Sequence, residues 1–100
     1  MADKFILDAN KKPQPATLEE WAEWFESAER HVAQDEVDGV SISTVFLGLD
    51  HQFGGGPPLL FETMIFGGKH NDYQERCSTW EQAVAQHAEA LRLVKQTASN

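Results

Sequence analysis

The chain has 100 residues and a formal net charge of −8, from 8 Lys and Arg against 16 Asp and Glu. A chain of this length builds one hydrophobic core, so we expect a single domain over residues 1–100, and its 41% of hydrophobic residues excludes a disordered acidic tail. The acidic balance argues against direct binding of duplex nucleic acid, which needs clustered Lys and Arg, and no apolar run reaches the ~20 residues of a membrane span.

The first predicted elements are a short strand and an amphipathic helix. Phe5–Leu7 is an apolar run typical of an edge strand, and the two prolines within residues 11–15 predict a break in regular structure. Thr17 is the expected N-cap of a helix, and Glu20 is placed to complete a capping box. An acidic turn over residues 35–39 closes this element. Its apolar stripe has spacings of three and four and consists of Leu18, Trp21, Ala22, Phe25, Ala28 and Val32.

The middle of the chain predicts an antiparallel sheet. Residues 40–49 and 59–66 are rich in β-branched and aromatic side chains, which favours two strands. Residues 67–72 have the composition of a turn. Residues 73–77 are therefore expected to return as a third strand.

A second helix is expected to begin at Ser78 or Thr79, with an apolar stripe of Trp80, Val84, His87, Leu91 and Val94. The predicted order is β-α-β-β-β-α, an α+β fold in which a small antiparallel sheet of three to four strands packs with two helices. Both faces of this sheet carry apolar residues. Either one helix covers each face or a second copy of the chain covers the open face, and we expect a homo-oligomer.

The loop between the two central strands has an unusual composition. Three consecutive glycines followed by two prolines favour positive φ and close backbone approach. Successive glycine N–H groups can form an anion-binding concavity, and the side chains before them offer hydrogen bonds and a stacking face. The alternative is that the glycines serve only the turn. We place a ligand-binding site here, formed by Asp50, His51, Phe53, Gly54, Gly55 and Gly56.

Residues of the neighbouring strands extend the expected site. Glu62 lies inside an apolar strand and needs a partner if it faces inward, and Arg76 on the next strand is the candidate partner. Tyr73 is a further expected ligand contact. The four histidines show no metal-ligand spacing, so we expect neither a metal nor a cofactor. His87 lies within the second helix stripe, where a core or interface histidine is favoured over a ligand contact.

The first helix offers a second kind of surface. Trp24 lies off the centre of the apolar stripe, and burial against a loop is the alternative to an exposed role in protein contact. Residues 17–38 carry eight acidic residues and one Arg, so the negative charge is regional and does not exclude an anionic ligand at the glycine loop. The expected protein-contact surface consists of Trp24, Glu19, Glu20 and Glu23.

Three phrases of the sequence resemble a family of short, uncharacterised proteins from bacteriophages and prophages. The central phrase is STVFLGLDHxFGGGPPLLFETM at residues 43–64, and the others are Trp-x-x-Trp-Phe-Glu at residues 21–26 and Arg-x-Ser-Thr-Trp-Glu at residues 76–81. The resemblance covers nearly the whole chain and implies a phage origin. Cys77 stands where the family is expected to have an aromatic residue, and as a single cysteine it fits a reducing compartment.

The loop and the resemblance together lead to three hypotheses. The first is a non-enzymatic phage protein, acting in the cytoplasm of the infected bacterial host, that counters host defence by binding and sequestering a small signalling nucleotide. The alternative is an inhibitor that docks on a host defence protein through its acidic first helix. A further alternative is a nucleotide-degrading enzyme with His51 or Glu62 as general acid or base. The loop is stiffer and more polar than docking requires, so we favour the first hypothesis.

Overall fold

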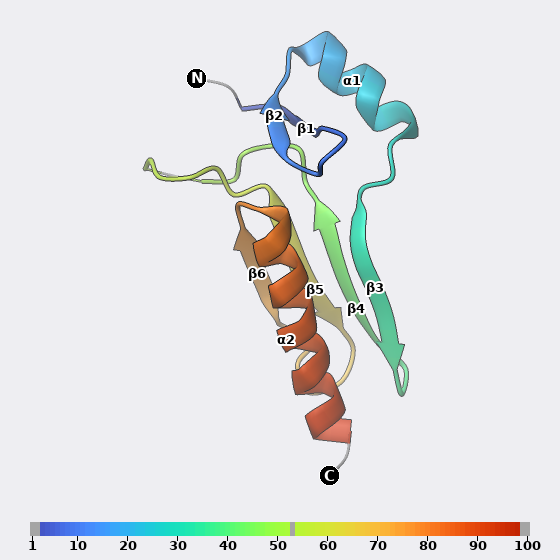
Figure 1. The fold of residues 1–100 in the computed structure, drawn as a ribbon. Helices are drawn as coiled ribbons and strands as arrows, with labels where there is room; N and C mark the ends of the chain where they lie inside the picture. Colours follow the sequence, from blue (N-terminus) through green and yellow to red (C-terminus); the bar gives the residue numbers. More distant parts are fainter. Residues whose placement is uncertain (1–2, 53, 99–100) are drawn as a thin grey trace.

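The computed structural model describes residues 3–52 and 54–98, which form two helices and six strands (Figure 1). Strands β1 and β2 form a two-stranded sheet, and the remaining strands form a four-stranded antiparallel sheet in the order β3-β4-β5-β6. The predicted α+β class is confirmed, with two strands more than expected. In chain order the elements are β1 (Phe5–Leu7), β2 (Pro13–Pro15), α1 (Leu18–Ser27), β3 (His31–Val37), β4 (Val40–Phe46), β5 (Phe61–Phe66), β6 (Gln74–Cys77) and α2 (Trp80–Ala98).

Strand β2 lies where the prolines predicted a break. Pro13–Pro15 pairs antiparallel with Phe5–Leu7, and prolines are tolerated here because the strand lies at a sheet edge. The Asp8 carboxylate closes the hairpin by accepting hydrogen bonds from the backbone N–H of Lys12 at 2.9 Å and of Asn10 at 2.8 Å. These bonds, the Lys12 bond foremost, hold the pKa of Asp8 below its ordinary value.

The first helix begins as predicted and ends earlier. The Thr17 hydroxyl accepts from the Glu20 N–H at 3.2 Å, and the Glu20 carboxylate accepts from the Thr17 N–H at 2.9 Å, which confirms the capping box. The helix ends at Ser27, and Ala28 is already extended with φ −76° and ψ 144°. The prediction that the helix stripe reaches Val32 is wrong, because residues 31–37 pair with β4 instead.

The acidic segment predicted as a closing turn is mostly strand β3. Only Asp38 and Gly39 turn the chain, with φ values of 50° and 81°. Two successive residues with positive φ are typical of a tight hairpin turn, whose twist matches the strands on either side. The Asp-Gly pair between the two strands was therefore the signal for a β3–β4 hairpin.

The central strands are confirmed with shorter bounds. Strand β4 ends at Phe46 rather than Leu49, and β5 begins at Phe61 rather than Leu59. The turn over residues 67–72 and the return strand β6 are present as predicted.

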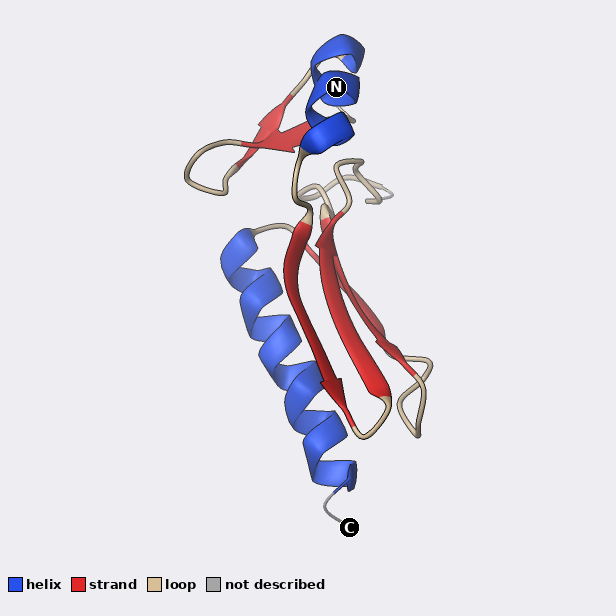
Figure 2. Cartoon of the chain, turned by 90° about the vertical axis from the view of Figure 1, so that its right-hand side faces the viewer, coloured by secondary structure: helices blue, strands red, loops and turns tan. Residues whose placement is uncertain are grey.

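Helix α2 covers one face of the four-stranded sheet (Figures 1 and 2). Its predicted start is confirmed, since the Thr79 hydroxyl accepts from the Gln82 N–H at 3.1 Å and Trp80 is the first helical residue. The predicted stripe is partly wrong, because Val84 is 48% exposed. The residues of α2 that are buried against the sheet are Ala83, His87, Ala90 and Val94.

Helix α1 does not cover the opposite face of the sheet. It lies beyond the upper end of β3 and β4, beside β1 and β2 (Figure 1). In the described part of the chain no helix lies on that opposite face (Figure 2), which we call the open face; the face under α2 is the covered face. None of the helices in residues 3–52 and 54–98 is long and apolar enough to cross a membrane.

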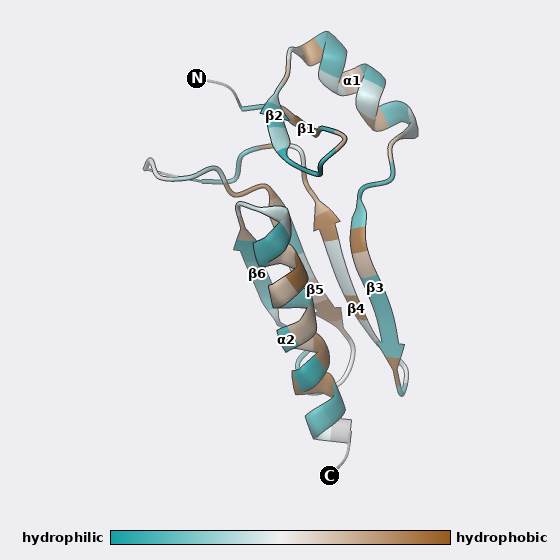
Figure 3. Cartoon of the chain, viewed as in Figure 1, coloured by the Kyte–Doolittle hydropathy of each residue, from teal (hydrophilic) through white to brown (hydrophobic). Residues whose placement is uncertain are grey.

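The core has two parts. The aromatic end lies at the top of the sheet and is built around Phe5, Leu7, Phe46, Leu60, Phe61, Cys77 and Ala83, with Trp24, Phe25, Val32 and Trp80 packed against it. The aliphatic end lies under the second half of α2 and consists of Ile42, Ile65, Ala90 and Val94. Figure 3 shows β4 as hydrophobic at its upper end and paler in the middle, where serine and threonine residues lie.

Candidate functional site

The base of the glycine loop is closed by Asp50. Its Oδ1 accepts hydrogen bonds from the backbone N–H of Gln52 at 2.8 Å and of Leu59 at 3.0 Å. The backbone N–H of His51 donates to the Leu59 carbonyl at 3.1 Å. Asp50 therefore links the two arms of the loop, and the predicted site residues Asp50 and His51 both lie at the base of the loop.

The three glycines lie at the exposed tip of the loop, which projects from the upper part of the molecule (Figure 1). Gly54, Gly55 and Gly56 have φ values of 81°, 92° and 99°. An anion-binding nest alternates right- and left-handed residues, so three positive φ values in succession differ from that arrangement. Phe53, the predicted stacking residue, lies outside the described residues.

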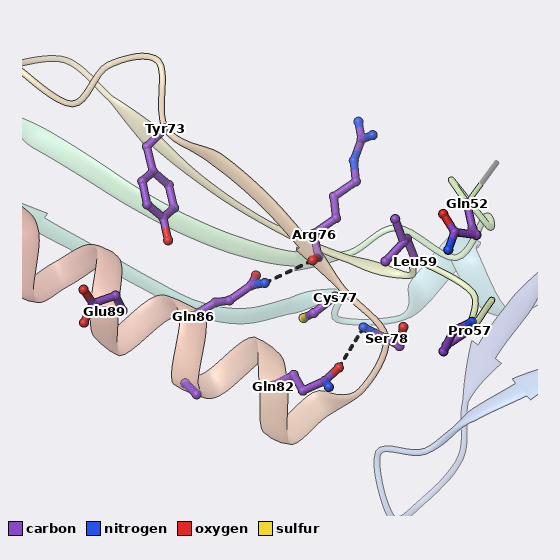
Figure 4. Close-up of a pocket in the computed structure, with 11 residues that line it drawn as sticks. Gln52, Pro57, Leu59, Tyr73, Arg76, Cys77, Ser78, Gln82, Gln86 and Glu89 are labelled. Atoms are coloured by element: carbon purple, nitrogen blue, oxygen red, sulfur yellow. Dashed lines mark hydrogen bonds between the residues drawn. The ribbon is translucent and has the colours of Figure 1, made fainter. Parts of the chain in front are cut away.

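A groove of about 630 Å³ lies at the foot of the loop, between β6 and the first half of α2 (Figure 4). Its walls come from three separate segments of the chain, and their lining is mostly apolar with several amide groups. The loop contributes Gln52, Pro57 and Leu59, the β6 side contributes Tyr73, Arg76, Cys77 and Ser78, and the helix contributes Gln82, Ala85, Gln86 and Glu89.

Two glutamines of α2 are held in defined orientations beside this groove. Gln86 Nε2 donates to the Arg76 carbonyl at 3.1 Å, and Gln82 Oε1 accepts from the Ser78 N–H at 3.0 Å (Figure 4). The Tyr73 hydroxyl points from the sheet toward α2 (Figure 4). Burial, with a smaller contribution from Glu75, raises the pKa of Tyr73, so this hydroxyl remains a hydrogen-bond donor at neutral pH.

The thiol of Cys77 also lies in the groove lining. Burial raises its pKa to about 11, although a backbone hydrogen bond with Thr79 acts in the opposite direction. A thiol with this pKa is protonated at neutral pH and is a poor nucleophile. The position of Cys77 before a helix start therefore does not activate it.

Glu62 and Arg76 form the predicted pair, but on the open face of the sheet. Arg76 Nε donates to Glu62 Oε2 at 2.9 Å, and Gln74 Nε2 donates to the same oxygen at 2.6 Å. The Arg76 side chain points away from the groove, whose lining it supplies with its backbone (Figure 4). The structure thus brings Tyr73 to the groove, where the loop contributes Gln52, Pro57 and Leu59. The predicted Asp50, His51 and the three glycines do not belong to the groove lining, and the Glu62–Arg76 pair lies on the other side of β6.

The predicted protein-contact residues separate in a similar way. The Trp24 ring packs edge-on against Phe46, with ring centroids 5.7 Å apart, as part of the aromatic end. Glu20 is engaged in the capping box, and its hydrogen bonds to Thr17 lower its pKa. Glu19 and Glu23 remain exposed on α1.

A buried polar network lies between the two parts of the core. His87 Nδ1 is 2.8 Å from the Thr44 hydroxyl, which is 2.7 Å from the Thr63 hydroxyl. His87 Nε2 is 2.7 Å from Asp35 Oδ2. The core role favoured for His87 fits this position. The full network was missed, because it depends on the register of β3, β4 and β5.

Carboxylate, imidazole and hydroxyl follow one another in this network as they do in a hydrolase triad. Thr44, however, is fully buried and its hydroxyl is already paired with Thr63. A substrate atom has no access to it, so we assign the network to packing of α2 on the sheet. In residues 3–52 and 54–98 every buried side-chain nitrogen and oxygen has a hydrogen-bond partner.

The described residues hold no group of three or more His, Cys, Asp or Glu side chains arranged to bind a metal ion. Comparison of the chain with known protein families, curated proteins and solved structures finds no match.

Proposed function

We propose that the protein binds a small nucleotide-like ligand in the groove at the foot of the glycine loop and holds it without chemical change. The observation that carries this proposal is the groove itself. It joins the loop base, β6 and α2 in a volume of about 630 Å³, within the usual range of small-molecule sites.

The chemistry of the lining favours a base over a phosphate as the part recognised. The Tyr73 ring and Leu59 offer apolar surface, and the Gln82 and Gln86 side chains are of the type that pairs with base edges. Glu89 is acidic, and the guanidinium of Arg76 is turned away toward Glu62. We therefore expect the base to lie in the groove and the phosphates to extend toward solvent.

The biological role in this proposal rests on the sequence resemblance. The phrases that resemble short phage proteins favour a phage protein that acts in the cytoplasm of an infected bacterium. Removing a signalling nucleotide there would counter a host defence response. Sequestration requires binding alone, and the neutral Cys77 thiol and the closed Thr44 hydroxyl suit a site that binds without reacting.

Titration calorimetry tests the proposal with a panel of cyclic nucleotides and ADP-ribose-type nucleotides. We expect one of them to bind, and Gln86→Ala to weaken its binding by about tenfold, the value of one lost hydrogen bond of ~1.4 kcal/mol. Gln96→Ala, a change of the same residue type further along α2 and away from the groove, should bind like the unaltered protein. Equal affinities for both variants would refute the groove as the site.

The fate of the ligand separates a binding protein from an enzyme. The nucleotide should be recovered intact after the complex is denatured, and a shortened or opened product would support the degrading enzyme instead. The docking alternative keeps one favourable observation, since Leu18 is 62% exposed on α1 beside the acidic Glu19. No heat with any nucleotide, together with capture of one host protein that Leu18→Ser abolishes, would replace our proposal by that alternative.

A further inference from the structure

The open face of the four-stranded sheet has a regular relief. Side chains alternate between the two faces of a strand, so the buried Ile42, Thr44 and Phe46 place the intervening residues of β4 on the open face. Those residues of β4 are Ser41, Ser43 and Val45, and their direct neighbours on β5 are Phe66, Met64 and Glu62.

Each small residue on β4 lies beside a large one on β5. Ser41 pairs with Phe66, and Ser43 pairs with Met64. The open face therefore carries a ridge along β5 and a parallel trough along β4. Phe66 lies at one end of the ridge. Its side chain is large and hydrophobic, and it is 49% exposed.

We propose that a second copy of this chain covers the open face, with a two-fold axis parallel to the strands between β4 and β5. Rotation about this axis places β5 of one copy over β4 of the other. Phe66 then packs over the partner's Ser41, and Met64 packs over the partner's Ser43. Such a contact is self-complementary, as a two-fold interface requires, and the ridge of each copy fills the trough of the other.

The other way of stacking the two sheets fits less well. An axis perpendicular to the strands would set β5 over β5, so that the two ridges would meet. Phe66 would then lie over the partner's Glu62, and Met64 over the partner's Met64. With the parallel axis, Glu62 lies over the partner's Val45 instead, while its ion pair with Arg76 stays within its own copy.

The exposed area of the single chain also points to a missing partner. Its accessible surface is 6345 Å² for 11.2 kDa, whereas folded monomers of this mass expose about 5,700 Å². The chain is only 20 Å thick, which corresponds to one sheet and one helix. The excess of roughly 600 Å² approaches the ~800 Å² that each partner buries in a standard interface. A paired molecule would have four layers, with helices outside and sheets inside.

Light scattering coupled to size exclusion tests this arrangement at micromolar protein. The unaltered protein should have about twice its chain mass of 11.2 kDa. Phe66→Lys should have the mass of one chain, because a charge then enters an apolar contact. Val84→Lys is the matched control, since Val84 is 48% exposed on α2 and Phe66 is 49% exposed. The Val84 variant should remain a dimer, and circular dichroism should show both variants folded.

A mixing experiment tests the pairing itself. Ser41→Glu should also be monomeric, because its carboxylate would face the partner's Phe66. In an equimolar mixture of Ser41→Glu and Phe66→Lys, the new lysine faces the partner's new glutamate, and the dimer mass should return. A monomeric unaltered protein, a dimeric Phe66→Lys, or a mixture that stays monomeric would each overturn the proposal. The ligand groove lies on the other side of β6, so these outcomes are independent of nucleotide binding.

Discussion

The two helices are attached to the same sheet in different ways. Every residue of α1 keeps part of its side chain exposed, and the helix is held at the aromatic end by rings that lie against one another. Helix α2 instead buries small residues and one histidine, which forms hydrogen bonds to β3 and β4. The attachment of α1 depends on close packing of its rings against Gly48, and the attachment of α2 depends on hydrogen bonds between matched donors and acceptors.

Ring contacts run without interruption from α1 to α2. Trp21 and Phe25 have centroids 4.5 Å apart, Phe25 and Phe46 are 6.4 Å apart, and Phe46 and Phe61 are 5.2 Å apart. Phe61 then meets Trp80 edge-on at 6.3 Å. This continuous cluster explains how a helix with no fully buried residue is fixed in place.

Gly48→Ala should break the aromatic attachment and have the largest effect on stability. Gly48 has a φ of 75°, and a Cβ there would collide with Phe25 Cζ and lie 3.0 Å from Trp21 Nε1. Overpacking and backbone strain together predict a loss of about 3 kcal/mol or more in the free energy of unfolding, measured in urea. Gly55→Ala is the control, because Gly55 has a φ of 92° with nothing near its Cβ. Similar losses at both glycines would refute the steric explanation.

Thr44→Val should weaken the attachment of α2 by about 2 kcal/mol, because a valine leaves the buried His87 Nδ1 without its partner and removes one partner of the Thr63 hydroxyl. Ser43→Ala, the next residue on the same strand but on the open face, should change the free energy of unfolding by less than ~0.5 kcal/mol. The double variant Thr44→Val with His87→Leu should lose less than the sum of the two single changes. Full additivity would show that the hydroxyl and imidazole do not act together.

Thr17→Ala should cost about 1 kcal/mol, the usual value of a lost N-cap. The Thr17 hydroxyl accepts a hydrogen bond from the Glu20 N–H and so caps the N-terminus of α1. Thermal unfolding monitored by circular dichroism gives the difference, with Ser27→Ala at the other end of the helix as reference. An unchanged melting temperature would mean that ring contacts alone fix α1.

Alkylation of Cys77 should show the smallest effect at neutral pH. Because burial raises the thiol pKa to about 11, the rate with iodoacetamide should be low at pH 7 and still rise between pH 9 and pH 11. The unfolded thiol, with an ordinary pKa of 9.0, loses its proton first, so this group lowers stability as pH rises above that value. A rate that levels off by pH 8 would contradict the buried position.

The regions differ in how far the sequence predicted them. Helix α2 and strands β4, β5 and β6 have strong local patterns, and their order was predicted correctly. Strand β3 was missed because Val32 fits the helix spacing and the acidic residues 35–39 have the composition of a turn, and only pairing with β4 shows that residues 31–37 form a strand. The Asp38-Gly39 pair was the one local signal that favours the hairpin.

The candidate site was predicted in part for a related reason. Proximity in sequence placed the glycines in the site, whereas the groove forms below them, where the loop meets Tyr73 and α2. Alternation along β5 places Glu62 and Thr63 on opposite faces of the sheet. Which of the two residues lies on the covered face depends on strand register and burial. The contribution of Gln82 and Gln86 depends on how α2 rotates over the sheet, and the predicted stripe, which included Val84, had this rotation slightly wrong.

The clustering of rings at one end makes the protein's intrinsic fluorescence a local reporter. All three tryptophans, Trp21, Trp24 and Trp80, belong to the aromatic end or lie against it, and Lys11 Nζ is 5.4 Å from the Trp80 ring. Emission during unfolding therefore follows the region around α1, while far-ultraviolet dichroism is dominated by the longer α2. Two coincident transitions would mean that the ends unfold together, and an earlier fluorescence change would mean that the aromatic end opens first.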